Sequence, residues 1–201
     1  MIIASTCYLP MNKKVLREVY LEKRKTLTAS EHRSRSLSVC QQAINLFKNS
    51  DCQKIHLFLP IEAQNEVGTW TLYKSILADK RLEPVVSRTD FKSKTMTHYL
   101  ADSHTSFKED QYGIPTPNSG IEINTLEIDA VLTPLISFDL QGNRIGYGGG
   151  FYDRFLSECR TDVEVIGLAI TPPLDFIPYS ESHDFKMHKC INHQSVFHYG
   201  K

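Results

Sequence analysis

The stretch Asp139-Leu-Gln-Gly-Asn-Arg-Ile-Gly-Tyr-Gly-Gly-Gly-Phe-Tyr-Asp-Arg-Phe-Leu156 decides the fold expected for this chain. An apolar run over residues 128–138 precedes it, and apolar side chains take a helical spacing from Phe151 onward. The glycines therefore lie between a predicted strand and a predicted helix. Near-continuous apolar strands that alternate with helices are typical of a parallel sheet covered on both faces. We expect a single-domain, three-layer α/β/α fold with a mostly parallel open sheet.

The periodicity of the remaining chain fits this expectation. It predicts helices over 13–27, from the capping box Thr28-Ala-Ser-Glu31 onward, and from Trp70 onward. The second helix is predicted to face inward with Leu37, Cys40, Ile44 and Phe47. Predicted strands cover 55–60, 83–88, 128–138 and 163–170, with an edge strand over 96–101.

The glycine loop is a candidate anion-binding site. Glycines let a ligand lie against the backbone, and the free N–H groups of the following helix suit phosphate. Arg144 adds a planar cation for bidentate phosphate contact. Asp153 falls in the first helical turn, where it can complement the helix dipole or hold a divalent cation. The glycines concerned are Gly146, Gly148, Gly149 and Gly150.

The loop matches neither of two common phosphate-binding motifs. The chain contains no G-x-x-x-x-G-K-[ST], and Phe151 stands where the dinucleotide fingerprint needs its third glycine. The plainer interpretation is a glycine-rich turn ahead of a helix, with Asp153 as a helix-dipole partner. Arg144 and Asp153 on either side of the glycines favour an anion or nucleotide site.

The pattern F-D-x-x-G-N-R-x-G-x-G-x-G-x-Y-D, from Phe138 to Asp153, resembles the signature of 5-formyltetrahydrofolate cyclo-ligases, also called methenyltetrahydrofolate synthetases. The resemblance extends from Lys13 to about Asp184. It implies ATP-dependent conversion of 5-formyltetrahydrofolate to 5,10-methenyltetrahydrofolate, with release of ADP and phosphate. The formyl oxygen would be phosphorylated, and ring closure would follow. ATP and Mg²⁺ are the implied cofactors.

The resemblance also implies a role for the first helix. By pattern alone its basic face is a solvated surface. Family members carry K-x-x-x-R there, with cations that reach the ATP phosphates. Lys13 and Arg17 match that spacing on one helical face, and Lys14 can substitute for Lys13.

The remaining site residues follow from the resemblance in the same way. The catalytic residues would be Arg144 and Tyr152. The ATP-binding residues would be Lys13, Arg17, Arg144, Gly146, Gly148, Gly149, Gly150 and Tyr152. The folate would be bound by Glu66, Tyr147 and Phe151, and the metal by Asp153 and Asp184.

Four of these positions need separate comment, because they allow a plainer interpretation, rest on a second motif or depart from the family. Without the resemblance, the plainer interpretation of Glu66 is a carboxylate near the start of a helix. Asp184 follows His183 in an H-D pair like that of the family, whereas the intervals of five between histidines do not fit zinc. Some relatives carry basic residues at 147 and 149 that contact the polyglutamate tail, and this chain has Tyr147 and Gly149 instead.

Composition limits the classes of protein and partner. The 201 residues are 41% hydrophobic and 23% charged, with 23 cationic and 23 acidic side chains, so no net charge favours nucleic acid. No apolar run reaches membrane-spanning length. Five cysteines without C-x-x-C predict reduced thiols in a cytoplasmic protein. We expect small-molecule partners only, a monomer, an N-terminal extension over 1–10 and one cyclo-ligase-like domain over 11–201.

Two other classes of protein remain open from the sequence. One is an isomerase or CoA-transferase-like enzyme on a similar sheet, which would need a catalytic carboxylate near the loop but neither Lys13 nor Arg17. The other is a nucleotide- or folate-binding protein without turnover. The presence of Arg144, Tyr152 and Asp153 together argues against both.

Overall fold

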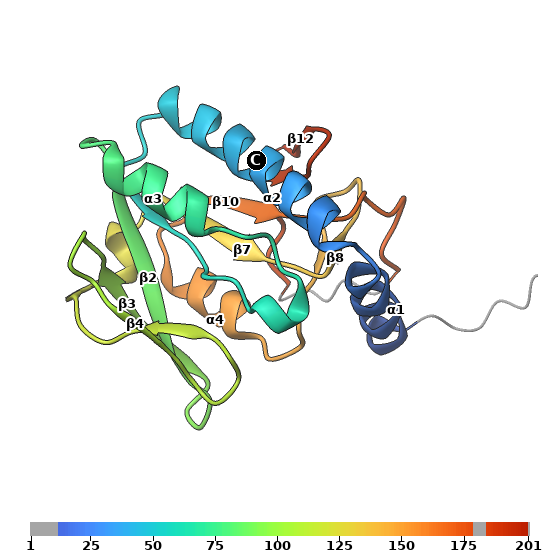
Figure 1. The fold of residues 1–201 in the computed structure, drawn as a ribbon, viewed down its shortest axis with the longest axis horizontal. Coiled ribbons are helices and arrows are strands. Elements are labelled where there is room, and N and C mark those ends of the chain that lie inside the picture. The colour runs from blue at the N-terminus through green and yellow to red at the C-terminus, as the bar shows by residue number, and fades with distance from the viewer. Residues whose placement is uncertain (1–11, 179–183, 201) are drawn as a thin grey trace, which may run out of the picture.

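A computed structural model describes residues 12–178 and 184–200, so the predicted extension over 1–10 and His183 lie outside the described residues. An eight-stranded sheet forms the centre of the molecule, and helices cover it (Figure 1). The strands run in the order β12 (Val196–His198), β11 (Lys189–Ile191), β10 (Glu164–Leu168), β7 (Ala130–Pro134), β1 (Lys54–His56), β2 (Glu83–Asp90), β3 (Thr95–Leu100) and β6 (Ile121–Ile123).

The five strands from β11 to β2 are mutually parallel, whereas β12, β3 and β6 pair antiparallel at the two ends. This confirms the expectation of a mostly parallel α/β sheet. The strand predicted over 96–101 is β3, and its expected place at an edge of the sheet was wrong, because β6 pairs along its outer side. The segment that forms β6 is only three residues long and gave no periodic signal.

Helices cover both faces of the sheet. On one face α2 (Ala29–Lys48) and α3 (Trp70–Ala78) pack on strand residues such as Ile55 and Leu132. On the other face α4 (Phe151–Glu158) packs through Phe155 on residues such as Val131. Val131 and Leu132 are neighbours in β7 and point to opposite faces, as the pleat of a strand requires. These layers match the predicted three-layer arrangement.

The capping box predicted at Thr28 is present, since the Thr28 hydroxyl accepts from the Glu31 N–H and the Glu31 carboxylate accepts from the Thr28 N–H. The inward face of α2 was predicted less well. Cys40 and Phe47 are buried, but Leu37 is half exposed. Ser36 is buried in its place because its hydroxyl accepts from the Gly68 N–H. A polar residue with a backbone partner thus takes a position expected for an apolar one.

Helix α1 (Lys13–Lys25) lies apart from α2 and α3, at the end of the molecule where β8 is labelled in Figure 1. Leu16 packs there on Ile136, Ile145 and Ile177. Asn12 caps the helix through its side chain, which accepts from the Val15 N–H. This packing brings the basic face of α1 beside the glycine loop.

The single strand predicted over 128–138 is two strands. After β7 the chain forms β8 (Ser137–Phe138), which pairs with β9 (Arg144–Ile145) as a hairpin. The buried Asp139 carboxylate holds its turn by accepting from the N–H groups of Gln141, Asn143 and Ile177 and from the Asn143 side chain, at 2.8–2.9 Å. The hairpin therefore sets Arg144 at a fixed point before the glycines.

The other described elements are short. Two further strands, β4 (Phe107–Glu109) and β5 (Pro115–Pro117), form a hairpin, and single 3₁₀ turns cover η1 (Glu62–Gln64) and η2 (Thr125–Glu127). Among the described residues no helix is both long enough and apolar enough to cross a lipid bilayer.

Candidate functional site

A cavity of about 1250 Å³ opens at the carboxyl ends of the central strands. His56 at the end of β1 and Pro134 at the end of β7 line it, together with the glycine loop. Ligands of open α/β sheets bind at this edge. All the site residues predicted from the sequence line this cavity: Lys13, Arg17, Glu66, Arg144, Gly146, Tyr147, Gly148, Gly149, Gly150, Phe151, Tyr152, Asp153 and Asp184.

The glycine loop uses the freedom of glycine at two positions. Gly148 has φ +91° and Gly150 has φ +65°, a region that other residues rarely adopt. A Cβ at Gly148 would lie 3.2 Å from the Arg17 guanidinium carbon. The Arg17 Nε donates to the Gly146 carbonyl at 2.7 Å, so α1 and the loop form one wall of the cavity.

Two cations of this wall are paired with the two predicted metal ligands. Arg144 donates to the Asp153 carboxylate at 2.6 Å and to the Phe185 carbonyl. Lys13 lies 2.6 Å from the Asp184 carboxylate. Each cation thus already holds an oxygen anion. Lys13 lines the cavity and its alternative, Lys14, is not among the lining residues.

The carboxylates suit a hard cation only in combination with a ligand. No group of three or more His, Cys, Asp or Glu side chains within 12–178 and 184–200 is arranged to hold a metal ion. Mg²⁺ usually takes one or two carboxylates and completes its shell with water and phosphate oxygens. Asp153 and Asp184 therefore fit Mg²⁺ that arrives with a phosphate ligand.

Glu66 lies behind the loop and is 4% exposed. Its carboxylate accepts from the Tyr147 hydroxyl at 2.6 Å and from the Ile61 N–H at 2.7 Å. Burial raises the pKa of Glu66, while these two hydrogen bonds and the charge of Arg24 oppose the rise. Arg24 is itself buried and donates to the Tyr147 hydroxyl. Sequence reasoning missed Arg24, because it stands in a run of three basic residues.

Aromatic side chains form the far wall. The Phe91 ring lies 4.2 Å from the Tyr112 ring and 5.3 Å from the Phe151 ring, between centroids, and all three line the cavity. Tyr152 also lines the cavity. Its burial, and then the charge of Glu66, raise the pKa of its phenol. Such a wall offers flat apolar surfaces to a planar ring.

A buried polar chain crosses three strands beneath α4. His56 of β1 and His98 of β3 bond from either side to the Ser87 hydroxyl of β2, at 2.7 and 2.8 Å. The His98 ring stacks on Phe155 at 4.0 Å, and the His56 ring meets Tyr152 edge-on at 5.8 Å. No sequence signal pointed to this chain, since its members come from three separate strands.

The hydrogen-bonded group of His56, Ser87 and His98 predicts that the protein loses stability in acid. Burial lowers the pKa of His98 from 6.5 to about 4, and burial together with the neighbouring His98 lowers the pKa of His56 well below its usual value, so both are neutral when folded. The unfolded chain binds their protons below about pH 6.5, so stability is complete above that value and falls toward pH 4. The shifted pKa of His98 alone should lower the free energy of unfolding by about 3 kcal/mol between pH 6.5 and pH 4.

The measurement is the free energy of unfolding by denaturant at several pH values. The variant His98→Phe should lose stability less steeply in acid, whereas His104→Gln, which changes an exposed histidine, should keep the wild-type slope. An equal slope in His98→Phe and the wild type would show that His98 does not carry the effect.

Comparison with known proteins gives one family. Residues 10–192 match the sequence profile of the 5-formyltetrahydrofolate cyclo-ligase family. The chain is 33% identical over 168 residues to the 5-formyltetrahydrofolate cyclo-ligase of Haemophilus influenzae, covering 79% of this chain and 87% of that one. It is 28% identical over 197 residues to that of Mus musculus, covering 91% and 94%.

Solved structures agree with the sequence comparison. The structure of Aquifex aeolicus 5,10-methenyltetrahydrofolate synthetase matches with a TM-score of 0.81 and 26% identity, over 94% of this chain and 93% of that one. The Mycoplasma pneumoniae 5,10-methenyltetrahydrofolate synthetase shares the fold, with a TM-score of 0.72 at 22% identity, over 92% of this chain and the whole of the other.

Proposed function

The chain belongs to the 5-formyltetrahydrofolate cyclo-ligase family, and from that premise we propose how its cavity carries out the family's reaction. The enzyme converts 5-formyltetrahydrofolate to 5,10-methenyltetrahydrofolate at the expense of ATP. We assign the triphosphate to the wall formed by α1 and the glycine loop, and the reduced folate to Glu66, Tyr147 and Phe151. The membership removes the two other classes left open by the sequence.

One observation carries this division of the cavity. The cavity is lined by two kinds of group: the cations of Arg17 and Arg144 with the glycine backbone, and the rings of Phe91 and Phe151 with the buried Glu66 carboxylate. Phosphates need cations and free N–H groups, and a pterin ring needs flat apolar contacts and a few hydrogen-bond acceptors. A single cavity therefore offers both substrates the chemistry that each requires.

The reaction needs both substrates in contact. The formyl oxygen is a poor leaving group while it is part of an amide. Its attack on the γ-phosphorus breaks the bond to ADP and makes the oxygen part of a phosphate ester. The second folate nitrogen then bonds to the formyl carbon and loses its proton, and phosphate departs with the original oxygen. No nucleophilic side chain of the protein is required.

The protein's contribution is position and charge. Phosphoryl transfer depends on alignment of the two oxygens and on neutralisation of the phosphate charge. Lys13, Arg17 and Arg144 supply the cations on this proposal, and Tyr152, which also lines the cavity, acts beside them. Mg²⁺, held by Asp153 and Asp184, would neutralise further phosphate charge when bound. Lys13 and Arg144 would exchange their present carboxylate partners for phosphate oxygens.

We further propose a monomer that acts in the cytoplasm on these two small molecules. The equal numbers of acidic and basic side chains support the absence of a nucleic-acid partner. The free thiols of Cys40, Cys52, Cys159 and Cys190 support a reducing compartment.

The test of the proposed function is direct. Purified protein is mixed with 5-formyltetrahydrofolate, with and without Mg-ATP, and methenyltetrahydrofolate is followed by absorbance. Product should require ATP, and one ADP should form for each product molecule. Product formation that continues undiminished without ATP would reject the proposal.

The metal assignment makes a separate prediction. Asp153→Asn keeps the shape of the side chain and removes its charge, so the fold should survive while more Mg²⁺ is needed for half-maximal activity and ATP binding. Asp184→Asn should act in the same direction but more weakly. Asp175→Asn, which changes an exposed carboxylate outside the cavity, is the matched control. Unaltered Mg²⁺ dependence in both variants would return Asp153 to the role of a helix-dipole partner.

A further inference from the structure

We propose that Arg24 is a positioning residue for the folate: acting through the Tyr147 hydroxyl, it holds Glu66 as an ionised acceptor for the ring N–H groups of the substrate. This rests on the proposed role of Glu66 in folate binding. Arg24 does not line the cavity, and its effect on the substrate is transmitted by hydrogen bonds.

The burial of Arg24 calls for an explanation. The side chain is 1% exposed, whereas its neighbours Lys23 and Lys25 on α1 are exposed. A buried guanidinium is costly unless it is paired. Among the described residues no carboxylate makes a direct ion pair with it. It donates instead to the Leu135 carbonyl at 3.2 Å and to the Tyr147 hydroxyl at 2.6 Å.

The Tyr147 hydroxyl gives this contact a direction. A phenol has one hydrogen, and a guanidinium has donors only. Because the hydroxyl accepts from Arg24, its own hydrogen is free to donate, and the Glu66 carboxylate lies 2.6 Å away to accept it. The positive charge of Arg24 and the negative charge of Glu66 therefore balance through one oriented phenol.

Glu66 is thereby fixed on both of its oxygens. One oxygen accepts from Tyr147 and the other from the Ile61 N–H. Each carboxylate oxygen has two acceptor sites, so capacity remains for donors that enter the cavity. Arg24 lies on α1, Tyr147 in the glycine loop, and Glu66 after η1. The unit thus joins three segments that contribute residues to the cavity lining.

The experiment is a double-mutant cycle on folate binding. The variants are Arg24→Met, Tyr147→Phe and the two combined, and the dissociation constants of 5-formyltetrahydrofolate and ATP are measured separately by calorimetry. Tyr147→Phe removes a hydrogen bond to a charged group, so folate affinity should fall about ten- to hundredfold. Arg24→Met should also lower the affinity for folate. The affinity for ATP should change little in either variant.

The combined variant decides whether Arg24 acts through Tyr147. If it does, Arg24→Met should cost nothing further once Tyr147→Phe has cut the connection. Fully additive losses would overturn the proposal, since they would mean that Arg24 acts separately, through the Leu135 carbonyl. Lys25→Met removes a charge from the next position of α1, where Lys25 pairs with the exposed Glu22, and should leave folate binding unchanged.

Glu66→Gln separates failure of this inference from failure of the proposed function. If Glu66→Gln leaves folate binding intact, the assignment of the folate to Glu66 fails. If Glu66→Gln weakens folate binding and Arg24→Met does not, only the inference about Arg24 fails. Should Arg24→Met not fold, the pH profile of Tyr147→Phe decides. Loss of that donor raises the pKa of Glu66, so folate binding should weaken at a higher pH than in the wild type.

Within residues 12–178 and 184–200, four titratable or charged side chains face Glu66 in this profile. They are Arg24 of α1, His32 of α2, whose Nε2 lies 2.6 Å from the Glu66 carbonyl, Tyr147 of the loop and Tyr152 of α4. Glu66→Gln removes the titrating carboxylate and so identifies its part of the profile. An acid limb of folate binding at the same pH in Tyr147→Phe and the wild type would overturn the inference.

Discussion

Arg144→Lys is expected to lower kcat/KM about ten- to hundredfold, which corresponds to about 1.5–3 kcal/mol of transition-state stabilisation. The guanidinium now directs one nitrogen to Asp153 and another to the Phe185 carbonyl, so it acts as a planar fork with two fixed directions. A lysine ammonium keeps the charge but cannot make both contacts in that geometry. The loss should therefore appear even though the net charge of the cavity is unchanged.

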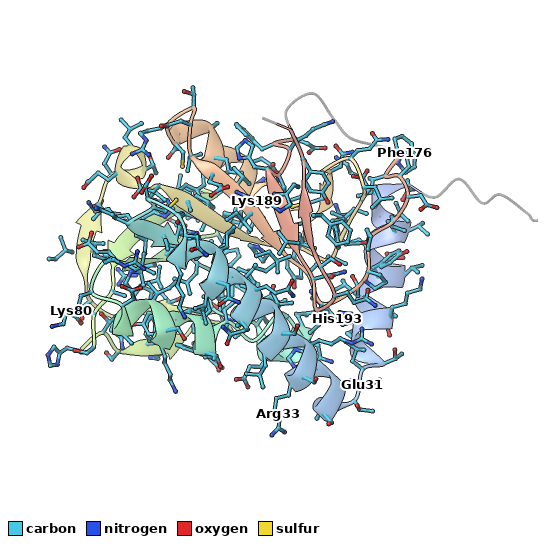
Figure 2. All side chains as sticks on the ribbon, turned by 90° about the horizontal axis from the view of Figure 1, so that it is seen from above. Glu31, Arg33, Lys80, Phe176, Lys189 and His193 are labelled. Carbon is cyan, nitrogen blue, oxygen red and sulfur yellow. The ribbon has the colours of Figure 1, made fainter. Side chains whose placement is uncertain are left out.

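The measurement is steady-state kinetics together with separate binding of ATP and folate. ATP affinity or kcat should fall, and folate affinity should stay near the wild-type value. Arg33→Lys is the matched control, because the Arg33 side chain points away from the ribbon at the surface of α2 (Figure 2). If Arg144→Lys weakens folate binding alone, the glycine loop serves the folate and the triphosphate must bind elsewhere.

Gly148→Ala is the other change with a large expected effect. A side chain at φ +91° costs on the order of 1–3 kcal/mol in backbone strain, and its Cβ would lie 3.2 Å from the Arg17 guanidinium carbon. Either the loop or Arg17 must move, and both form the wall assigned to the triphosphate. ATP affinity should fall up to about a hundredfold, if the full strain is expressed in binding.

Gly146→Ala provides the comparison, since nothing lies within 4 Å of a Cβ built at Gly146 and no positive φ is needed there. Its melting temperature should stay near that of the wild type, whereas Gly148→Ala should melt lower. Equal melting temperatures and equal ATP affinities for Gly148→Ala and the wild type would show that the loop adapts without cost.

The loop and its neighbours could be predicted because their signals are local. Glycines with flanking Arg144 and Asp153 sit in one continuous segment, and the capping box at Thr28 marks a helix start within four residues. Lys13 and Arg17 followed from the family resemblance, whose K-x-x-x-R spacing they match on one helix. The structure brings all of these residues to one cavity, and their individual roles remain predictions.

The residues that the sequence did not reveal depend on packing across distant segments. Arg24 looks like its solvated neighbours until α1 is placed against Tyr147. The chain of His56, Ser87 and His98 exists only because β1, β2 and β3 are adjacent in the sheet. The hairpin of β8 and β9 was not predicted, because β8 continues the apolar run of β7 and the turn held by the Asp139 carboxylate has no periodic signature.

The central claim is that ATP phosphorylates the formyl oxygen, and an oxygen-18 label in the formyl group of 5-formyltetrahydrofolate tests it most directly. After one turnover with Mg-ATP, mass spectrometry of the released phosphate reports where that oxygen went. The account predicts one labelled oxygen in each phosphate, because the formyl oxygen leaves bonded to phosphorus. Unlabelled phosphate, with the label recovered in water, would contradict it.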